Sequence, residues 1–136
     1  MSKEFILLLA SYFLIVPSVI GTGYLFVNLT NLKKNNFSYG YLGIIGCFFL
    51  ILYSYISHFF ISHSLIHNSM LIFIGIISFL ILLRKEFRRK EIIILSIVFS
   101  ILYISFLCYK TNDDFPYYHF AYTYYLNQNP IILGIG

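Results

Sequence analysis

Residues 68–90 read NSMLIFIGIISFLILLRKEFRRK, an apolar run that passes directly into a dense basic cluster. The apolar part, from Asn68 to about Leu83, approaches the roughly 20 residues that a helix needs to cross a hydrocarbon core of about 30 Å. Basic residues at the end of such a helix mark the side of the membrane on which the loop remains. This stretch therefore predicts a transmembrane helix followed by a positively charged loop.

Three further apolar runs flank this one and are separated by short polar segments. They extend from Phe5 to about Val27, from Tyr39 to about Ile61 and from Ile92 to about Tyr109. None has the alternation of apolar and polar residues that a transmembrane barrel strand requires, so each is predicted to be a helix. The predicted fold class is therefore all-α: a polytopic membrane protein with four transmembrane helices in residues 1–109 and a short interfacial helix on the outer face in residues 110–136.

The composition agrees with a membrane location. Of the 136 residues, 60% are hydrophobic and only 10% are charged, whereas charged residues make up about 25% of an ordinary soluble domain. The lipid bilayer is therefore a predicted partner. Nucleic acid is not, because most of the basic residues lie in loops next to predicted helices, where they determine topology. Binding of anionic lipid or nucleic acid by residues 84–90 is the minor alternative.

The basic residues also predict the orientation of the helices. Five of the nine lie in residues 84–90, and Lys33 and Lys34 lie between the first two runs. Helices that cross in alternate directions place these two loops on the same side, which the positive-inside rule assigns to the cytoplasm. Richness in Ile, Asn, Lys, Phe and Tyr is typical of an AT-rich bacterial genome. We therefore predict a multi-pass protein of the bacterial inner (plasma) membrane, with the N-terminus and residues 110–136 on the outer face.

Three histidines cluster between the second and third runs. His63 and His67 have the spacing that places two imidazoles on one helical face, and His58 precedes them. A zinc site needs at least three protein ligands, and no carboxylate or thiolate lies nearby in the sequence. A third ligand would have to come from the C-terminal segment, from Asp113, Asp114 or His119. Hydrogen bonding at the membrane surface is therefore the favoured role of the histidines, and neither a metal nor a cofactor is predicted.

The C-terminal segment differs from the rest of the chain because it combines carboxylates with many tyrosines. Lys110–His119 reads KTNDDFPYYH, which places Asp113 and Asp114 directly after the fourth apolar run. Tyrosines are typical of the headgroup level, and Pro116 fits the first turn of a surface helix from about Phe115 to Leu126. Either carboxylate can simply cap that helix, which is worth about 1 kcal/mol. The alternative is a chemical role at the membrane surface, where an unused carboxylate is costly.

Asp114-Phe-Pro-Tyr-Tyr-His119, followed later by Leu133-Gly134-Ile135-Gly136, resembles the first outer loop of bacterial membrane proteins related to the GT-C class of glycosyltransferases. Members of this class transfer a sugar from a polyprenyl-phosphate donor to a lipid, glycan or protein acceptor on the outer face. The resemblance implies that Asp114 is the catalytic base and that Asp113 supports it. It also implies that Tyr118 and His119 bind substrate.

Two departures from the GT-C pattern limit the resemblance. The aspartate loop of that class usually follows the first helix, whereas three additional apolar runs precede it here. Members of the class also continue through many more helices, so the apolar stretch that ends at Gly136 predicts that the chain is the N-terminal part of a longer enzyme. The alternatives are a non-enzymatic small membrane protein, such as a transporter subunit or assembly partner, and a fragment of a polysaccharide polymerase or flippase.

Overall fold

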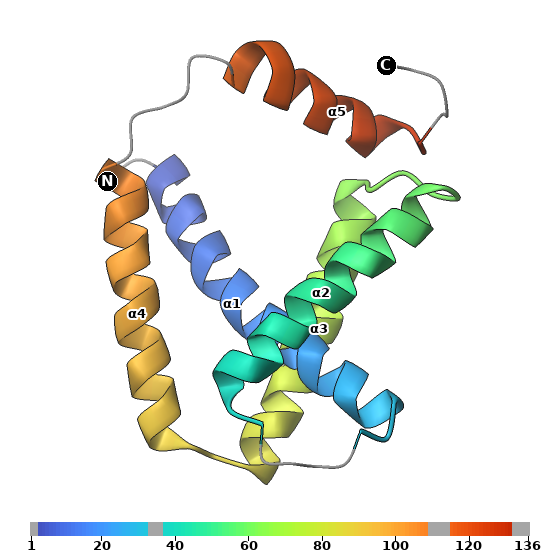
Figure 1. Ribbon diagram of the computed structural model, residues 1–136. Helices are drawn as coiled ribbons and strands as arrows, with labels where there is room; N and C mark the ends of the chain where they lie inside the picture. The colour runs from blue at the N-terminus through green and yellow to red at the C-terminus, as the bar shows by residue number, and fades with distance from the viewer. Residues whose placement is uncertain (1–2, 33–36, 109–114, 132–136) are drawn as a thin grey trace.

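The computed structural model describes residues 3–32, 37–108 and 115–131, and these contain helices but no strand. The long helices are α1 (Lys3–Leu29), α2 (Tyr39–His58), α3 (Leu65–Lys85) and α4 (Arg89–Cys108). A π-helical turn, η1 (Phe115–His119), leads directly into the short helix α5 (Phe120–Gln128) (Figure 1). The all-α prediction is confirmed.

Three helices are long and apolar enough to span a membrane, namely Ile6–Leu29, Tyr39–His58 and Leu65–Lys85. Their outward side chains are large and hydrophobic, as with Phe48 and Phe73, which are 66% and 65% exposed. Such surfaces are covered by lipid rather than by water in a stable protein. The structure is therefore compatible with an integral, multi-pass membrane protein. The fourth predicted span and the interfacial position of the last helix stay predictions.

Serine side chains cap the starts of α2 and α3. Ser38 Oγ accepts a hydrogen bond from Tyr41 N at 3.3 Å, and Ser64 Oγ accepts one from His67 N at 3.4 Å. Each serine satisfies a backbone donor of the first helical turn. Because Ser64 is the cap, α3 begins at Leu65, before the predicted Asn68. The α2 helix ends at His58 rather than near Ile61, because residues 59–64 form the turn that leads to this cap.

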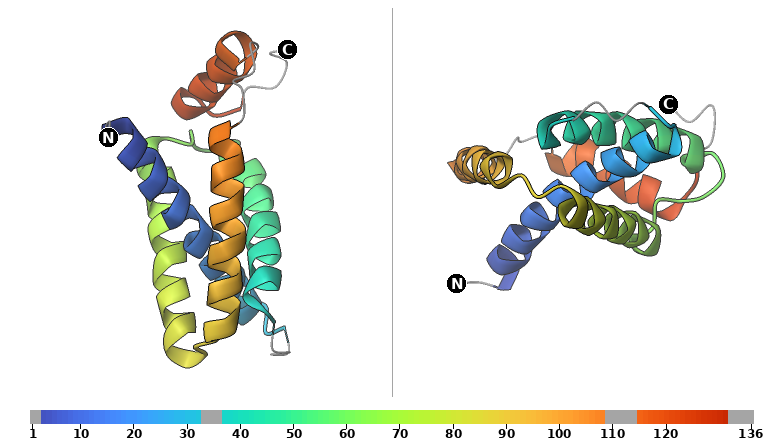
Figure 2. Two further views of the ribbon diagram at one scale, coloured as in Figure 1. Left: turned by 90° about the vertical axis from the view of Figure 1, so that its left-hand side faces the viewer. Right: turned by 90° about the horizontal axis from the view of Figure 1, so that it is seen from below.

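The first helix is the centre of the bundle. It packs against both α2 and α3, and the view from below in Figure 2 shows it running between them. The helices meet at glycines: a Cβ atom on Gly21 would collide with the backbone of Gly75, and one on Gly23 with the backbone of Leu42 in α2. Ser18 Oγ also donates to Ile72 O at 3.1 Å. Backbone contact between small residues is a typical way for helices to associate in a membrane.

The fourth helix stands apart from α2 and is held mainly at two places (Figure 1). From its middle onward, α4 contacts α1: the Tyr12 hydroxyl of α1 donates to Phe99 O at 2.9 Å, and the Tyr12 and Tyr103 ring centroids are 5.1 Å apart. Near its N-terminal end, a polar cluster joins α4 to the start of α2. The faces of α2 and α4 that look toward each other between these two points are apolar.

Arg88 organises that polar cluster. It forms ion pairs with Glu86 at 2.6 Å and with Glu91 at 3.1 Å, and its Nη1 donates to Phe37 O at 3.1 Å. Glu91 in turn accepts from the backbone N–H of Tyr39 at 2.6 Å. Hydrogen bonds from Arg88 to Glu91 and Glu86 raise the pKa of the guanidinium. These contacts place the α1–α2 and α3–α4 connections at one end of the bundle, opposite the α2–α3 turn.

Candidate functional site

The three histidines lie together at the α2–α3 turn, as their spacing predicts. His58 is the last residue of α2, His63 lies in the turn and His67 is in the first turn of α3. The His63 ring is in contact with both neighbours: its centroid is 4.3 Å from that of His58 and 4.8 Å from that of His67. The turn thus folds His63 between two residues that belong to different helices.

A hydrogen-bond network fixes these imidazoles. Asn68 Nδ2 donates to His63 O at 3.0 Å, which orients the amide so that Asn68 Oδ1 faces His67 Nδ1 at 3.3 Å. Because an amide oxygen only accepts, His67 Nδ1 carries a proton, and His67 Nε2 pairs with the Tyr53 hydroxyl at 3.2 Å. His63 Nε2 pairs with Ser57 Oγ at 3.0 Å.

The environment of His63 favours its neutral form. Burial, followed by the neighbouring His58 and then His67, lowers the pKa of His63 below its ordinary value of 6.5. A neutral imidazole both donates and accepts a hydrogen bond, whereas a protonated one only donates. His58 is only 3% exposed, and its Nε2 has no hydrogen-bond partner among the described residues. The cluster therefore leaves one buried polar atom without a partner.

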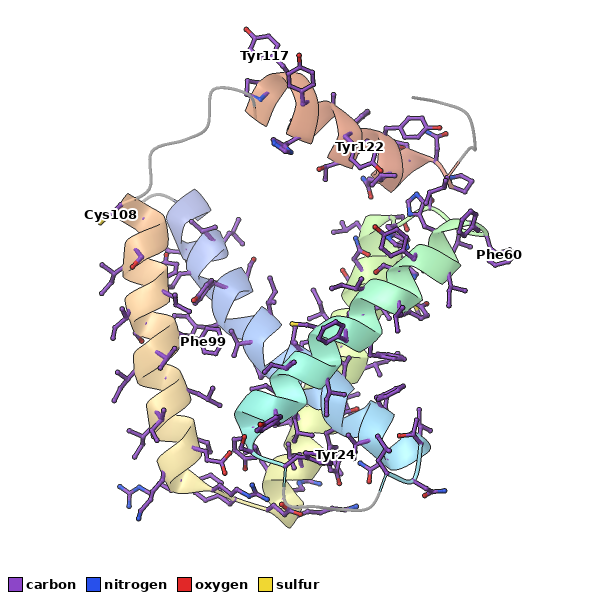
Figure 3. The ribbon with its side chains drawn as sticks, in the orientation of Figure 1. Tyr24, Phe60, Phe99, Cys108, Tyr117 and Tyr122 are labelled. Carbon is purple, nitrogen blue, oxygen red and sulfur yellow. The ribbon has the colours of Figure 1, made fainter. Side chains whose placement is uncertain are left out.

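The α5 helix lies over this end of the bundle (Figure 1). Two backbone hydrogen bonds attach its C-terminal end to the turn: His63 N donates to Leu126 O at 3.3 Å, and Ile131 N donates to His58 O at 3.0 Å. In Figure 3, Tyr117 lies at the end of this segment farthest from the α2–α3 turn, and Tyr122 lies closer to it. The attachment leaves an open space between α5 and α2.

That space is a pocket of about 390 Å³. Its polar lining comes from Ser54, Tyr55, His58, His63 and Tyr122, and its apolar lining comes from leucine and isoleucine side chains. A pocket with a mostly apolar wall and a few convergent polar groups is the usual form of a small-molecule site. Because the walls come from α2, the turn and α5, the site forms only when α5 is docked.

The residues predicted from the GT-C resemblance are related to this pocket to different degrees. Asp113 and Asp114 lie outside the described residues. Tyr118 is 71% exposed in η1, and His119 is exposed beside it; neither is among the residues that line the pocket. The structure joins the histidine cluster to α5 through the backbone of Leu126, and Tyr122 lines the pocket with the histidines where Tyr118 and His119 do not.

A helix is present where one was predicted from about Phe115 to Leu126, as η1 followed by α5, and it extends two residues beyond the expected Leu126. Its position at the membrane surface stays a prediction. Its capping by Asp113 or Asp114 falls outside the described residues and stays a prediction. Within residues 3–32, 37–108 and 115–131, no group of three histidine, cysteine or acidic side chains is arranged to hold a metal ion. The three imidazoles contact each other through their rings, and the nitrogens of His63 and His67 form hydrogen bonds to Ser57, Tyr53 and Asn68.

Sequence reasoning missed Ser54 and Tyr55 as components of the site. Both lie on α2 about one turn before His58, so helical spacing from His58 is the signal that could have found them. Docking of α5 had no such signal, since it depends on backbone contacts between distant segments. Comparisons with known proteins add no further assignment: no family model, no curated protein and no solved structure matches this chain.

Proposed function

We propose that this protein is the N-terminal part of a GT-C-like glycosyltransferase that uses a polyprenyl-phosphate-linked sugar donor on the outer face of a bacterial inner membrane. The observation that carries the proposal is the pocket of about 390 Å³ beneath α5. It lies beneath α5, into which η1 leads, and Asp114 directly precedes η1 in the sequence.

The lining of the pocket suits an amphipathic ligand. Tyr55 and Tyr122 offer aromatic rings and hydroxyl groups, which together favour contact with a sugar. His58 and His63 add imidazoles to the same wall, which favours a ligand that carries hydroxyl or phosphate oxygens. Isoleucine and leucine residues of the wall favour the adjoining prenyl chain. A ligand with a polar head and an apolar tail therefore satisfies both kinds of surface.

The transfer follows from general-base catalysis. Asp114 takes the proton from an acceptor hydroxyl group, and the acceptor oxygen forms a bond to the anomeric carbon of the sugar. The bond from that carbon to the phosphate oxygen breaks, and polyprenyl phosphate leaves with the electron pair. Asp113 supports the charge on Asp114, and Tyr118 and His119 contact the substrate. The lipid phosphate is itself the leaving group, so the proposal requires no nucleotide site.

The test replaces the base by its isosteric amide in the full-length protein. Asn caps a helix about as well as Asp but cannot accept a proton at this step, so Asp114→Asn should reduce transfer by roughly 10²- to 10⁴-fold. Transfer would be measured in membranes with a polyprenyl-phosphate sugar, and the amount of protein would be measured on the same samples. Asp113→Asn is the matched control and should reduce transfer less.

The outcomes separate catalysis from capping. Full transfer by Asp114→Asn at normal abundance would show that Asp114 has only a structural role. Loss of the protein from the membrane in both variants would show that the acidic pair is needed for folding, and the base assignment would then fail. Loss of transfer at normal abundance in Asp114→Asn alone would support the proposed role.

A further inference from the structure

A second cavity lies between α2 and α4, toward the end of the bundle that carries the Arg88 cluster. It has a volume of about 530 Å³, larger than the pocket beneath α5. Its floor is α1, from Ile15 to Ile20, and one wall is formed by α4 residues Leu95 and Phe99. We call this cavity the α2–α4 groove. Its lining is almost entirely hydrophobic, so water is a poor occupant.

Glycines on α2 give the groove its depth. Gly40 and Gly43 both line it, and neither is packed against another backbone. A Cβ atom on Gly43 would make only ordinary contact with Ile20 Cγ1 at 3.6 Å, whereas one on Gly46 would collide with Val19 O. Gly46 is therefore needed for helix packing, but Gly43 is not. The space beside Gly43 is available to a ligand.

The lower end of the groove meets the basic loop. Tyr39 lines the groove, and the Arg88 guanidinium lies 6.0 Å from the centroid of its ring. Arg89 and Lys90 are exposed at the start of α4. Leu95 of the groove wall follows Arg89 by six residues, a rise of about 9 Å along the helix. The positive charge of the first turn of α4 therefore lies at the level of this end of the groove.

The local charge favours an anion. Residues 84–91 hold five basic and two acidic residues. Both acidic side chains, Glu86 and Glu91, are paired with Arg88. The basic residues outside these pairs are Arg84, Lys85, Arg89 and Lys90, and all four are exposed. Basic residues beside a spanning helix attract anionic lipids at the membrane surface.

We propose that the α2–α4 groove binds an anionic phospholipid from the leaflet that faces the α3–α4 loop. One acyl chain fills the apolar groove beside Gly43, and the phosphate lies against Arg89 and Lys90. This occupant matches both the hydrophobic lining and the positive charge at its end. The end of the groove beside Arg88 lies opposite the α2–α3 turn, although Ile51 of α2 borders both the groove and the pocket beneath α5. The lipid proposal does not depend on the proposed glycosyl transfer.

The first experiment measures lipid retention by native mass spectrometry of the purified full chain in detergent. Phosphatidylglycerol and phosphatidylcholine with identical acyl chains would be titrated separately. The proposal requires one phosphatidylglycerol molecule to bind with higher affinity than phosphatidylcholine. Equal affinity for the two lipids would overturn the anionic specificity.

The second experiment places a larger side chain in the groove. Gly43→Leu adds a side chain where the acyl chain should lie, and it should weaken phosphatidylglycerol binding more than about ten-fold, because each excluded methylene changes affinity by roughly four-fold. Ser105→Leu adds comparable bulk at an exposed position of α4 outside the groove, and it should leave binding unchanged. Thermal unfolding of each variant would establish that the bundle is intact.

The third experiment removes two positive charges at one of two places in the loop and compares the effects on lipid binding. Arg89→Gln with Lys90→Gln should weaken phosphatidylglycerol binding by about 25-fold, or roughly five-fold for each charge. Arg84→Gln with Lys85→Gln removes the same charge from the end of α3, which does not line the groove, and should have a smaller effect. Equal losses from the two pairs would show diffuse attraction and overturn the site.

The groove assignment fails in two further cases. Undiminished phosphatidylglycerol binding by a folded Gly43→Leu protein would show that the lipid lies elsewhere. A dimer that Gly43→Leu converts to a monomer, with no specific lipid bound to the wild-type chain, would show that a second copy occupies the groove.

Discussion

At the scale of single residues, the protonation of His63 depends on the groups around it, because burial and two neighbouring histidines lower its pKa. Its ring lies between two other imidazoles, and its backbone N–H is one of two donors that hold the C-terminal segment. A positive charge on His63 would also face any charge on His58 or His67. The same residue therefore links the charge of the cluster to the docking of α5.

We expect this end of the protein to lose stability as the pH falls. The folded-state pKa of His63 is below its ordinary value of 6.5, so the unfolded chain takes up the proton first. Stability is then lost progressively from about pH 6.5 downward, through the folded-state pKa. Hydrogen exchange of the α5 amides between pH 8 and pH 5 would measure this loss.

His63→Asn keeps a polar side chain but removes the group that takes up the proton, so it should reduce the dependence of α5 protection on pH. His119→Asn is the control, because it removes an exposed histidine outside the ring cluster. Protection of α5 that is independent of pH in the wild-type protein, or equally altered by both substitutions, would contradict the role of His63.

Sequence reasoning at this scale found the histidines but not their pocket. His63 and His67 are four residues apart, so local helical geometry brings them together. Tyr122 reaches the same site from a distant segment, and its approach depends on the hydrogen bonds between His63 and Leu126 and between Ile131 and His58. Such long-range backbone contacts leave no periodic pattern in the sequence.

At the scale of helices, hydrophobic runs predict where each helix lies but not what it touches. A helix that is long and apolar enough can lie in lipid whatever its neighbours are, so length and composition alone mark α1, α2 and α3 as possible spans. The choice of partner depends on shape, and here it comes from glycine faces on α1, α2 and α3. The helix ends likewise depend on single side chains, as at Ser64, which begins α3 earlier than the apolar run indicates.

Two glycine substitutions distinguish the effect of close helix packing on stability from the effect of helix propensity. Gly21→Ala places a Cβ atom against the Gly75 backbone, and we expect it to lower the free energy of unfolding by about 1–3 kcal/mol. Gly43→Ala meets only Ile20 at 3.6 Å and should be neutral or stabilising by up to about 1 kcal/mol, since alanine favours helix. Denaturant titration in detergent micelles would compare them. Similar values for the two variants would contradict the close α1–α3 contact.

At the scale of the whole molecule, charge and geometry together predict how the chain crosses the membrane. The structure joins the α1–α2 and α3–α4 connections through Arg88 and Glu91. The α2–α3 turn lies at the other end with α5. The basic residues near the first end favour the cytoplasm. The sequence thus predicts the sidedness, and the structure shows which segments must share a side.

Reporter fusions would test that orientation. We expect an export-dependent reporter joined after Tyr109 to be active and one joined at Phe87 to be silent. A third fusion at Ser62, in the α2–α3 turn, is the control and should match the fusion after Tyr109. Activity at Phe87 alone would reverse the orientation and remove the outer-face chemistry. A difference between Ser62 and Tyr109 would show that α4 does not span the membrane.

The central position of α1 has a consequence for biosynthesis. This helix leaves the ribosome before α2 and α3, yet one of its two packing partners is complete only when Lys85 has been added. Until then, the Ser18 hydroxyl lacks its acceptor at Ile72, and the glycine face toward Gly75 is open. The nascent protein therefore reaches its native arrangement only after α3 has entered the membrane, and synthesis that stops within α2 leaves a helix pair without its third member.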